Sequence, residues 1–180
     1  MDKPIFYCDC DGVILNTIEV GFNIMQEMGC NMNNRKEVDY YFKHVVDWND
    51  IFDRATFINN SIDQIKYLQR QKIFEDIFIL TKLSGALHEE RLKRDLFKEK
   101  LSDIKVITLQ YDLSKASVVL AKGNVLLDDE VHNCRKWDNE NGVSVLFSTY
   151  MSNLESNIIS NICDITNTEG VKKLMKTRYF

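Results

Sequence analysis

The sequence lacks the features that would place it in several large classes of protein. Its 180 residues include one proline and seven glycines, with no low-complexity linker and no internal repeat. No apolar run approaches the length of a membrane span, and the first residues do not form a signal peptide pattern. The net charge of -4 comes from 27 acidic and 23 basic residues, so neither a nucleic acid polymer nor an anionic membrane is an expected partner.

The cysteines are neither numerous nor spaced in a way that builds a scaffold. Their number is odd, and no Cys-x-x-Cys pair occurs. Cys8 and Cys10 flank one aspartate, too close on one strand to bridge to each other, and they lack the partners of a zinc site. We therefore expect reduced thiols, which favours a cytoplasmic location. The five positions are Cys8, Cys10, Cys30, Cys134 and Cys163.

What the chain does have is a regular series of short apolar runs. With 44% hydrophobic and 28% charged residues, it is long enough for one domain with a sizeable core and a small inserted subdomain. Helical patterns lie between the runs, and this alternation predicts a parallel sheet covered on both faces, a three-layer Rossmann-like α/β fold. The expected strands are 5–8, 77–80, 106–109, 125–127, 143–147 and 162–165, and the expected helices are 86–101, 114–120, 133–141 and 168–176.

One stretch breaks the alternation. About sixty residues separate the first expected strand from the second, which is too long for a structureless loop in a compact domain. Residues 18–28 and 51–71 have helical patterns. We expect residues 17–75 to form a small helical cap subdomain over the edge of the sheet, and residues 1–16 and 76–180 to form the core domain. The alternative is an ordinary crossover enlarged by extra helices.

Acidic and hydroxyl side chains follow three of the apolar runs. Asp9 and Asp11 follow the first run, Thr81 follows the second, and Asp128 and Asp129 follow the fourth. In open parallel sheets, ligands bind beyond the carboxyl ends of the strands. Carboxylates gathered there repel one another and raise each other's pKa, and a hard cation that prefers oxygen ligands relieves this. The pattern therefore predicts an Mg²⁺ site.

The Asp-x-Asp-Gly segment has two interpretations. In an extended strand the side chains of Asp9 and Asp11 leave on the same side, and Gly12 lets the chain turn sharply after them. One aspartate can then face the metal and the substrate while the other lies near the leaving group. The alternative is a pair of turn-forming aspartates, because Asp-Gly is common in turns.

The order of these pieces along the chain resembles that in the haloacid dehalogenase superfamily. The four motifs of that superfamily are an apolar strand ending in Asp-x-Asp-Gly, a strand ending in Thr or Ser, a Lys, and a strand ending in paired acids. All four occur here in that order and span residues 9 to 129, which implies the fold of that superfamily. They are Phe6 to Val13, Ile79 to Thr81, Lys115, and Leu126 to Asp129.

The resemblance implies catalytic roles for four residues. Asp9 would attack phosphorus and form an aspartyl-phosphate, and Asp11 would protonate the leaving oxygen and then activate water. Thr81 would hydrogen-bond a phosphoryl oxygen, and Lys115 would neutralise charge on the phosphoryl group and on Asp9. The alternatives are that Thr81 simply ends a strand and that Lys115 is a solvated lysine at a helix start.

The resemblance also implies the ligands of the metal. Asp9, the backbone carbonyl of Asp11, and Asp128 or Asp129 would hold Mg²⁺, which lets an anionic carboxylate approach an anionic phosphate. Asp128 is the favoured direct ligand of the pair, and helix capping is the alternative role for one of the two acids.

Within the superfamily, the chain is similar to the 5'(3')-deoxyribonucleotidases. The expected insertion has the size and position of their small helical cap. Two departures concern base recognition: Asn16-Thr17-Ile18 stands where those enzymes place an aromatic, and Lys82-Leu83 follows the second-motif Thr in place of Pro or Ser. The residues that carry the similarity are Lys115 to Val119, Val125 to Asp129, Asn133, Trp137, Gly142, and Val145 to Phe147.

The sequence thus predicts a cytoplasmic, Mg²⁺-dependent phosphatase that acts on a small phosphate monoester. The expected substrate is a nucleoside monophosphate, and a sugar phosphate or similar metabolite is the alternative. A signalling receiver domain is disfavoured, because its phospho-accepting aspartate would end a middle strand, whereas the second and third runs end in Thr81 and Gln110. A catalytically inactive binding protein is disfavoured because all the expected acids are present. A homodimer is left open.

Overall fold

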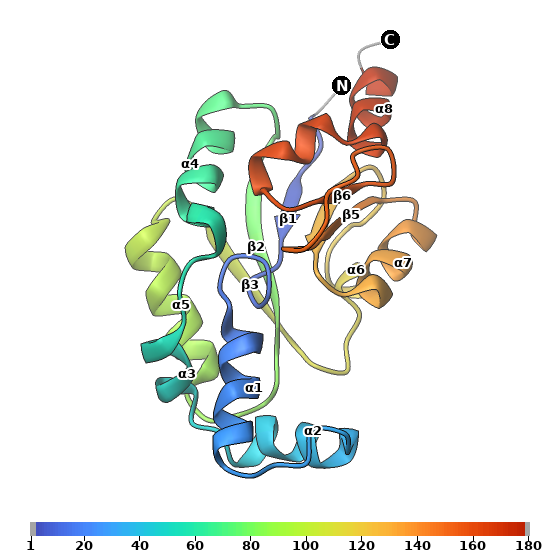
Figure 1. Cartoon of the computed structure of the whole chain (residues 1–180). Coiled ribbons are helices and arrows are strands. Elements are labelled where there is room, and N and C mark those ends of the chain that lie inside the picture. Colours follow the sequence, from blue (N-terminus) through green and yellow to red (C-terminus); the bar gives the residue numbers. More distant parts are fainter. Residues whose placement is uncertain (1–2, 179–180) are drawn as a thin grey trace.

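A parallel β-sheet forms the centre of the computed structural model, which describes residues 3–178 (Figure 1). Its described strands lie in the order β3-β2-β1-β4-β5-β6, and each pairs in parallel with its neighbours. The central strands are buried on both faces, which explains their continuous apolar sequences. The strands are β1 (Phe6–Cys8), β2 (Ile77–Leu83), β3 (Lys105–Gln110), β4 (Val125–Asp128), β5 (Val143–Phe147) and β6 (Ile158–Ile159).

Helices cover both faces of this sheet. They are α1 (Thr17–Glu27), α2 (Arg35–His44), α3 (Trp48–Arg54), α4 (Ser61–Gln71), α5 (Glu89–Lys100), α6 (Lys115–Val118), α7 (Val131–Asn139) and α8 (Glu169–Arg178), with 3-10 helices η1 (Ile58–Asn60) and η2 (Ile162–Asn167). Side chains of α4, α5, α8 and η2 share one hydrophobic cluster with Phe6 and Cys8 of β1. On the opposite face, Trp137 of α7 packs against Tyr7. This layering confirms the predicted three-layer Rossmann-like fold.

Two predicted strands differ from the structure. The second run continues to Leu83, so Thr81 lies inside β2 rather than at its end. The prediction of a strand at 162–165 is wrong, because these residues lie in η2 and the last described strand is β6. Ile162 and Ile165 are both buried, and their spacing of three residues suits one face of a 3-10 turn rather than a strand.

The helices between β1 and β2 also differ in part from the prediction. The expected helix over 51–71 is divided into α3 and α4, because Ala55 and Phe57 are extended and Asn59 and Asn60 adopt left-handed backbone conformations with φ of 47° and 56°. Asparagine tolerates this region better than most residues, so the pair interrupts the helix. The helix α2 was not predicted; none of its residues is fully buried, and its apolar Val38, Tyr41 and Phe42 are only partly buried.

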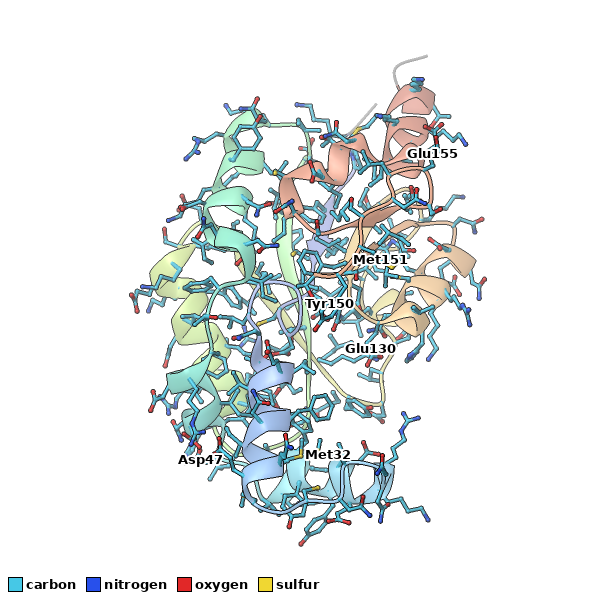
Figure 2. The ribbon with its side chains drawn as sticks, viewed as in Figure 1. Met32, Asp47, Glu130, Tyr150, Met151 and Glu155 are labelled. Carbon is cyan, nitrogen blue, oxygen red and sulfur yellow. The ribbon has the colours of Figure 1, made fainter. Side chains whose placement is uncertain are left out.

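The segment between β1 and β2 packs as two groups. The helices α1 and α3 share a hydrophobic cluster of their own, against which side chains of α2 pack, whereas α4 contributes Ile62, Ile65 and Leu68 to the cluster beneath the sheet. Figure 1 shows α1 and α2 below the strands and α4 beside them. In Figure 2, Asp47, whose carboxylate accepts from the backbone N of Asn49 at the start of α3, lies at the lower left. The division into residues 1–16 and 76–180 as core and 17–75 as cap stays a prediction, and the packing groups α4 with the sheet.

Two features of the composition have structural counterparts. All five cysteines are free, and four of them are buried. In the described part of the chain, none of the helices combines the length and the apolar character that crossing a bilayer requires.

Candidate active site

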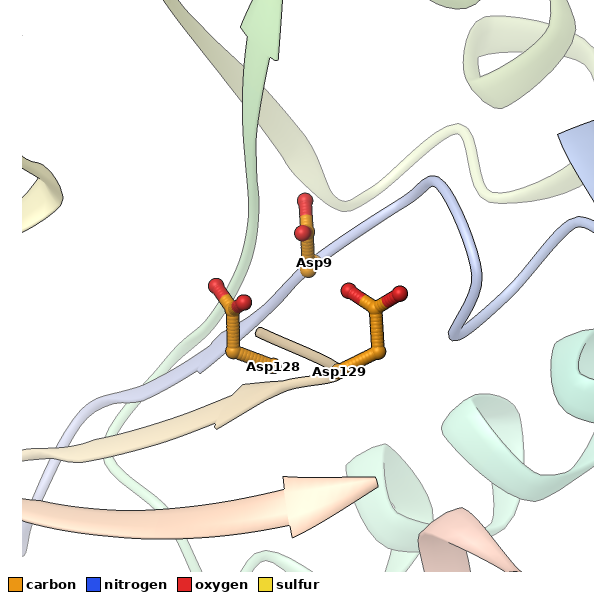
Figure 3. A group of neighbouring side chains, drawn as sticks. All are labelled: Asp9, Asp128 and Asp129. Atoms are coloured by element: carbon orange, nitrogen blue, oxygen red, sulfur yellow. The ribbon is translucent and has the colours of Figure 1, made fainter. Parts of the chain in front are cut away.

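The site forms where β1 and β4 end side by side. The backbone N of Asp9 donates to the carbonyl oxygen of Leu127 at 2.9 Å, which extends the pairing one residue beyond β1. Asp9 therefore lies beside Asp128, the last residue of β4, and Asp129, the residue after it. A carboxylate oxygen of each acid lies within 4.8 Å of the others, and Figure 3 shows the three carboxyl groups on the same side of the strand ends.

The turn after Asp9 is shaped to fit against Asp129. Gly12 has φ of +74°, in the region that favours glycine, and a Cβ built there would lie 2.2 Å from Oδ2 of Asp129. The backbone of Gly12 therefore borders the acid group directly. The glycine of the Asp-x-Asp-Gly segment is thus needed for the turn and for the space that the carboxylate occupies.

The three acids carry more negative charge than their surroundings balance. Burial raises the pKa of Asp9 to about 7, although Lys115 opposes this, and Asp128 and Asp11 raise it further. Burial also raises the pKa of Asp129 to about 8, with contributions from Asp9 and Asp128. A cation bound among them would relieve this repulsion. The donor set consists of carboxylate oxygens, which fits a hard divalent ion such as Mg²⁺.

Lys115 provides the positive charge inside this group. It is the first residue of α6 and is buried, and its Nζ lies 2.8 Å from Oδ1 of Asp9 and 2.7 Å from Oδ2 of Asp128. Burial alone would lower the pKa of Lys115, but the two carboxylates outweigh it and keep the pKa above its usual value. The structure thus brings Lys115 into contact with two of the three acids.

Asp128 and Asp129 differ in how much of their hydrogen-bonding capacity is already used. Asp128 accepts from Lys115, from the backbone N of Glu130 and from Nδ2 of Asn133. Within the described residues, no hydrogen bond to the Asp129 carboxylate is found, and its side chain is only partly buried. The lone pairs of Asp129 are therefore the more available ones for a cation.

Asp11 lies in a second, adjoining cluster. Its Oδ1 accepts from Oγ1 of Thr17 at 2.7 Å, and its Oδ2 accepts from Oγ1 of Thr81 at 3.2 Å and from Nζ of Lys93 at 2.5 Å. Thr81 therefore contacts Asp11 here. The structure places Asp9, Lys115, Asp128 and Asp129 together, and it places Asp11 and Thr81 beside them in a network of their own.

Lys93 of α5 was missed in the sequence and is central to that second cluster. It is 0% exposed, and its Nζ also donates to Oε1 of Glu89 at 2.8 Å and to the carbonyl oxygen of Lys82 at 3.0 Å. The centre of the Trp48 ring in α3 lies 5.0 Å from Nζ of Lys93. Burial alone would lower the pKa of Lys93, but Asp11, Cys10 and Glu89 together outweigh it and raise the pKa.

A signal for Lys93 did exist in the sequence. Glu89, Lys93 and Phe97 recur at intervals of four residues, and all three are buried on one face of α5. Leu87, which belonged to the predicted apolar stripe, is 78% exposed. The ion pair between Glu89 and Lys93, four residues apart on the helix, therefore lies on its buried face, although charged residues at this spacing suggested a face exposed to solvent.

Comparisons with known proteins define the fold. No protein-family model matches the sequence, and no curated protein matches it. Solved structures do match, and they are hydrolases of the haloacid dehalogenase superfamily, subfamily IA among them. The chain therefore shares the fold of these hydrolases.

Three of these structures show how completely the fold is shared. A hydrolase of family IA, variant 3, from Entamoeba histolytica is 12% identical with a TM-score of 0.63, covering 98% of this chain and 100% of that one. A hydrolase from Xanthomonas campestris is 7% identical with a TM-score of 0.61, covering 97% and 93%. A hydrolase from Bacillus subtilis, bound to magnesium, is 11% identical with a TM-score of 0.59, covering 93% and 98%.

Proposed function

We propose that the protein is an Mg²⁺-dependent phosphatase that hydrolyses a small phosphate monoester through an aspartyl-phosphate at Asp9. The observation that carries this proposal is the arrangement of Asp9 between a buried ammonium group and two further carboxylates. Asp9 and Asp129, with Asp128 and the backbone carbonyl of Asp11, would hold the ion. When bound, Mg²⁺ supplies the positive charge that lets a carboxylate approach a phosphate.

Asp9 is the nucleophile in this mechanism. Its carboxylate oxygen forms a bond to phosphorus while the bond from phosphorus to the ester oxygen breaks. Lys115, 2.8 Å from Asp9, stays protonated and balances charge on the carboxylate and on the incoming phosphoryl group. Water then attacks the phosphorus of the aspartyl-phosphate, which releases inorganic phosphate and restores Asp9.

Asp11 is the general acid and base. It takes up a proton when it leaves Lys93, gives that proton to the leaving ester oxygen, and the resulting carboxylate later takes a proton from the attacking water. In the structure its carboxylate faces Thr17, Thr81 and Lys93, so it must turn toward Asp9 to reach the ester. When Asp11 turns, Lys93 keeps Glu89 as a partner, and Thr81 is freed to donate to a phosphoryl oxygen.

A nucleoside monophosphate is the proposed substrate, as for a 5'(3')-deoxyribonucleotidase, and a sugar phosphate or other small metabolite is the second candidate. The helices α1 to α3 are rich in aromatic residues, which suits a nucleobase. Several of these rings are already engaged with one another: Phe22 meets Phe42 edge-on, and Trp48 is buried against Phe52. Base recognition therefore depends on aromatic surface that remains exposed.

A panel of phosphate esters assayed with Mg²⁺ tests the proposal. We expect turnover that EDTA abolishes, and deoxyribonucleotides hydrolysed faster than sugar phosphates. Asp9→Asn should abolish turnover and leave the circular dichroism spectrum unchanged, while the exposed control Asp103→Asn should keep full activity. Activity retained in Asp9→Asn would remove the nucleophile assignment, and equal rates for both ester classes would remove the nucleotide assignment alone.

A further inference from the structure

A third ammonium group, besides those of Lys115 and Lys93, lies at the edge of the site. Lys82 follows Thr81 in β2, and its Nζ donates to Oδ1 of Asn133 at 3.0 Å. Nδ2 of Asn133 in turn donates to Oδ1 of Asp128 at 2.9 Å, and the other oxygen of Asp128 accepts from Lys115. Two hydrogen bonds thus connect Lys82 to the carboxylate that Lys115 contacts.

The charge of Lys82 is not balanced by an ion pair. Among the described residues, no carboxylate oxygen lies within 4.0 Å of its Nζ, whereas Lys115 contacts two carboxylates. Burial lowers the pKa of Lys82, and the ammonium of Lys115 lowers it further, against Asp128 and Glu130. A partly buried cation whose hydrogen-bond partner is a neutral amide gains most from an arriving anion.

The position of Lys82 indicates which part of a substrate it would meet. Lys115 is 2% exposed and lies against the nucleophile, Lys82 is partly buried, and Tyr111 is 62% exposed with its ring centre 5.8 Å from Nζ of Lys82. Exposure therefore increases from Lys115, beside the nucleophile, through Lys82 to Tyr111 at the surface. In the proposed mechanism Lys115 and the cation held by the acids would bind the phosphoryl group, so Lys82 would be left for a more distant group.

We propose that Lys82, held by Asn133 and flanked by Tyr111, binds a second anionic group on the substrate, a carboxylate or a second phosphate carried by the leaving group. This inference rests on the proposed phosphatase function and narrows its substrate class. It favours esters with two anionic ends over esters whose leaving group is neutral.

Matched ester pairs test this assignment. One pair is 3-phosphoglycerate and glycerol 3-phosphate, which differ by a carboxylate, and the other is a deoxynucleoside 3',5'-bisphosphate and the corresponding 5'-monophosphate. We expect the native chain to prefer the more anionic member of at least one pair. Lys82→Met should reduce that preference, measured as the ratio of kcat/KM values, by about tenfold. Lys82→Arg should restore it, and the exposed control Lys122→Met should leave it unchanged.

Two results would overturn the inference. One is that the native chain shows no preference for the more anionic ester in either pair. The other is that Lys82→Met lowers kcat/KM equally for both members of a pair, which is expected if Lys82 only supports the fold or contacts the phosphoryl group. Binding of the same esters, measured by calorimetry with Ca²⁺ in place of Mg²⁺, separates this failure from failure of the phosphatase proposal. Binding preference that depends on Lys82 without any turnover would refute the phosphatase function and keep the anion site.

Discussion

Replacing Lys93 with methionine should destabilise the protein severely. The side chain is 0% exposed, and its ammonium lies 2.5 Å from Asp11 and 2.8 Å from Glu89, which are themselves largely buried. Methionine matches the length of the side chain but removes the charge, so two carboxylates would face each other without a cation. Breaking a buried ion pair from one side costs about 3–5 kcal/mol. We expect Lys93→Met to lower the free energy of unfolding by this amount.

Urea unfolding followed by circular dichroism measures the effect, and a double mutant tests its cause. Adding Glu89→Gln to Lys93→Met removes one of the two unpaired carboxylates. The double mutant should therefore recover about 1–3 kcal/mol relative to Lys93→Met alone. The control Lys98→Met, at an exposed position of the same helix, should change stability by less than about 0.5 kcal/mol. A loss below about 1 kcal/mol in Lys93→Met would refute the buried network.

Three further predictions concern the acid group. Because the pKa values of Asp9 and Asp129 are raised from 3.8 to about 7 and about 8, the folded chain binds more protons than the unfolded chain, and stability in EDTA should fall as the pH rises from about 4 through about 8. Thermal melting curves recorded in EDTA should show this fall of stability with pH, and added Mg²⁺ should make it smaller. Asp129→Asn should make stability less dependent on pH and abolish the stabilisation by Mg²⁺. Stability that does not change with pH in the native chain would contradict the prediction. Lys115→Met should lower kcat by about a hundredfold to a thousandfold in steady-state assays, because charge on Asp9 and the phosphoryl group is then unbalanced. Gly12→Ala should weaken Mg²⁺ binding, measured by calorimetry, by about tenfold or more. The added Cβ would displace the Asp129 carboxylate, and φ of +74° disfavours alanine. Unchanged affinity for Mg²⁺ would show that the close approach of Gly12 to Asp129 is not needed.

Local patterns were enough to predict the sheet and the acids at its edge. Each central strand is a short apolar run, because both of its faces are covered, and parallel strands deliver their carboxyl ends to one edge. Asp9, Asp128 and Asp129 meet there for that reason. The short β6 left too few residues for a pattern, and the interruption of the helix at Asn59 and Asn60 depends on backbone conformation that residue type only favours.

The orientation of Asp11 could not be predicted in the same way. It depends on Thr17, Thr81 and Lys93, which come from three different elements and meet only after the chain has folded. The charged residues of α5 suggested a solvated face, although the face with Lys93 is the one that the fold buries. The periodicity of a sequence shows which residues share a face of a helix, but it does not show which distant carboxylate pairs with a buried lysine.

Trapping the covalent intermediate tests the central claim most directly. The protein would be mixed with its ester and Mg²⁺, quenched in acid and treated with borohydride, which reduces an acyl phosphate to an alcohol, and its peptides would then be analysed by mass spectrometry. We predict reduction of the side chain at Asp9 and at no other aspartate, and none when the ester is omitted. Turnover of the ester with an unreduced Asp9, or reduction at a different carboxylate, would contradict the account.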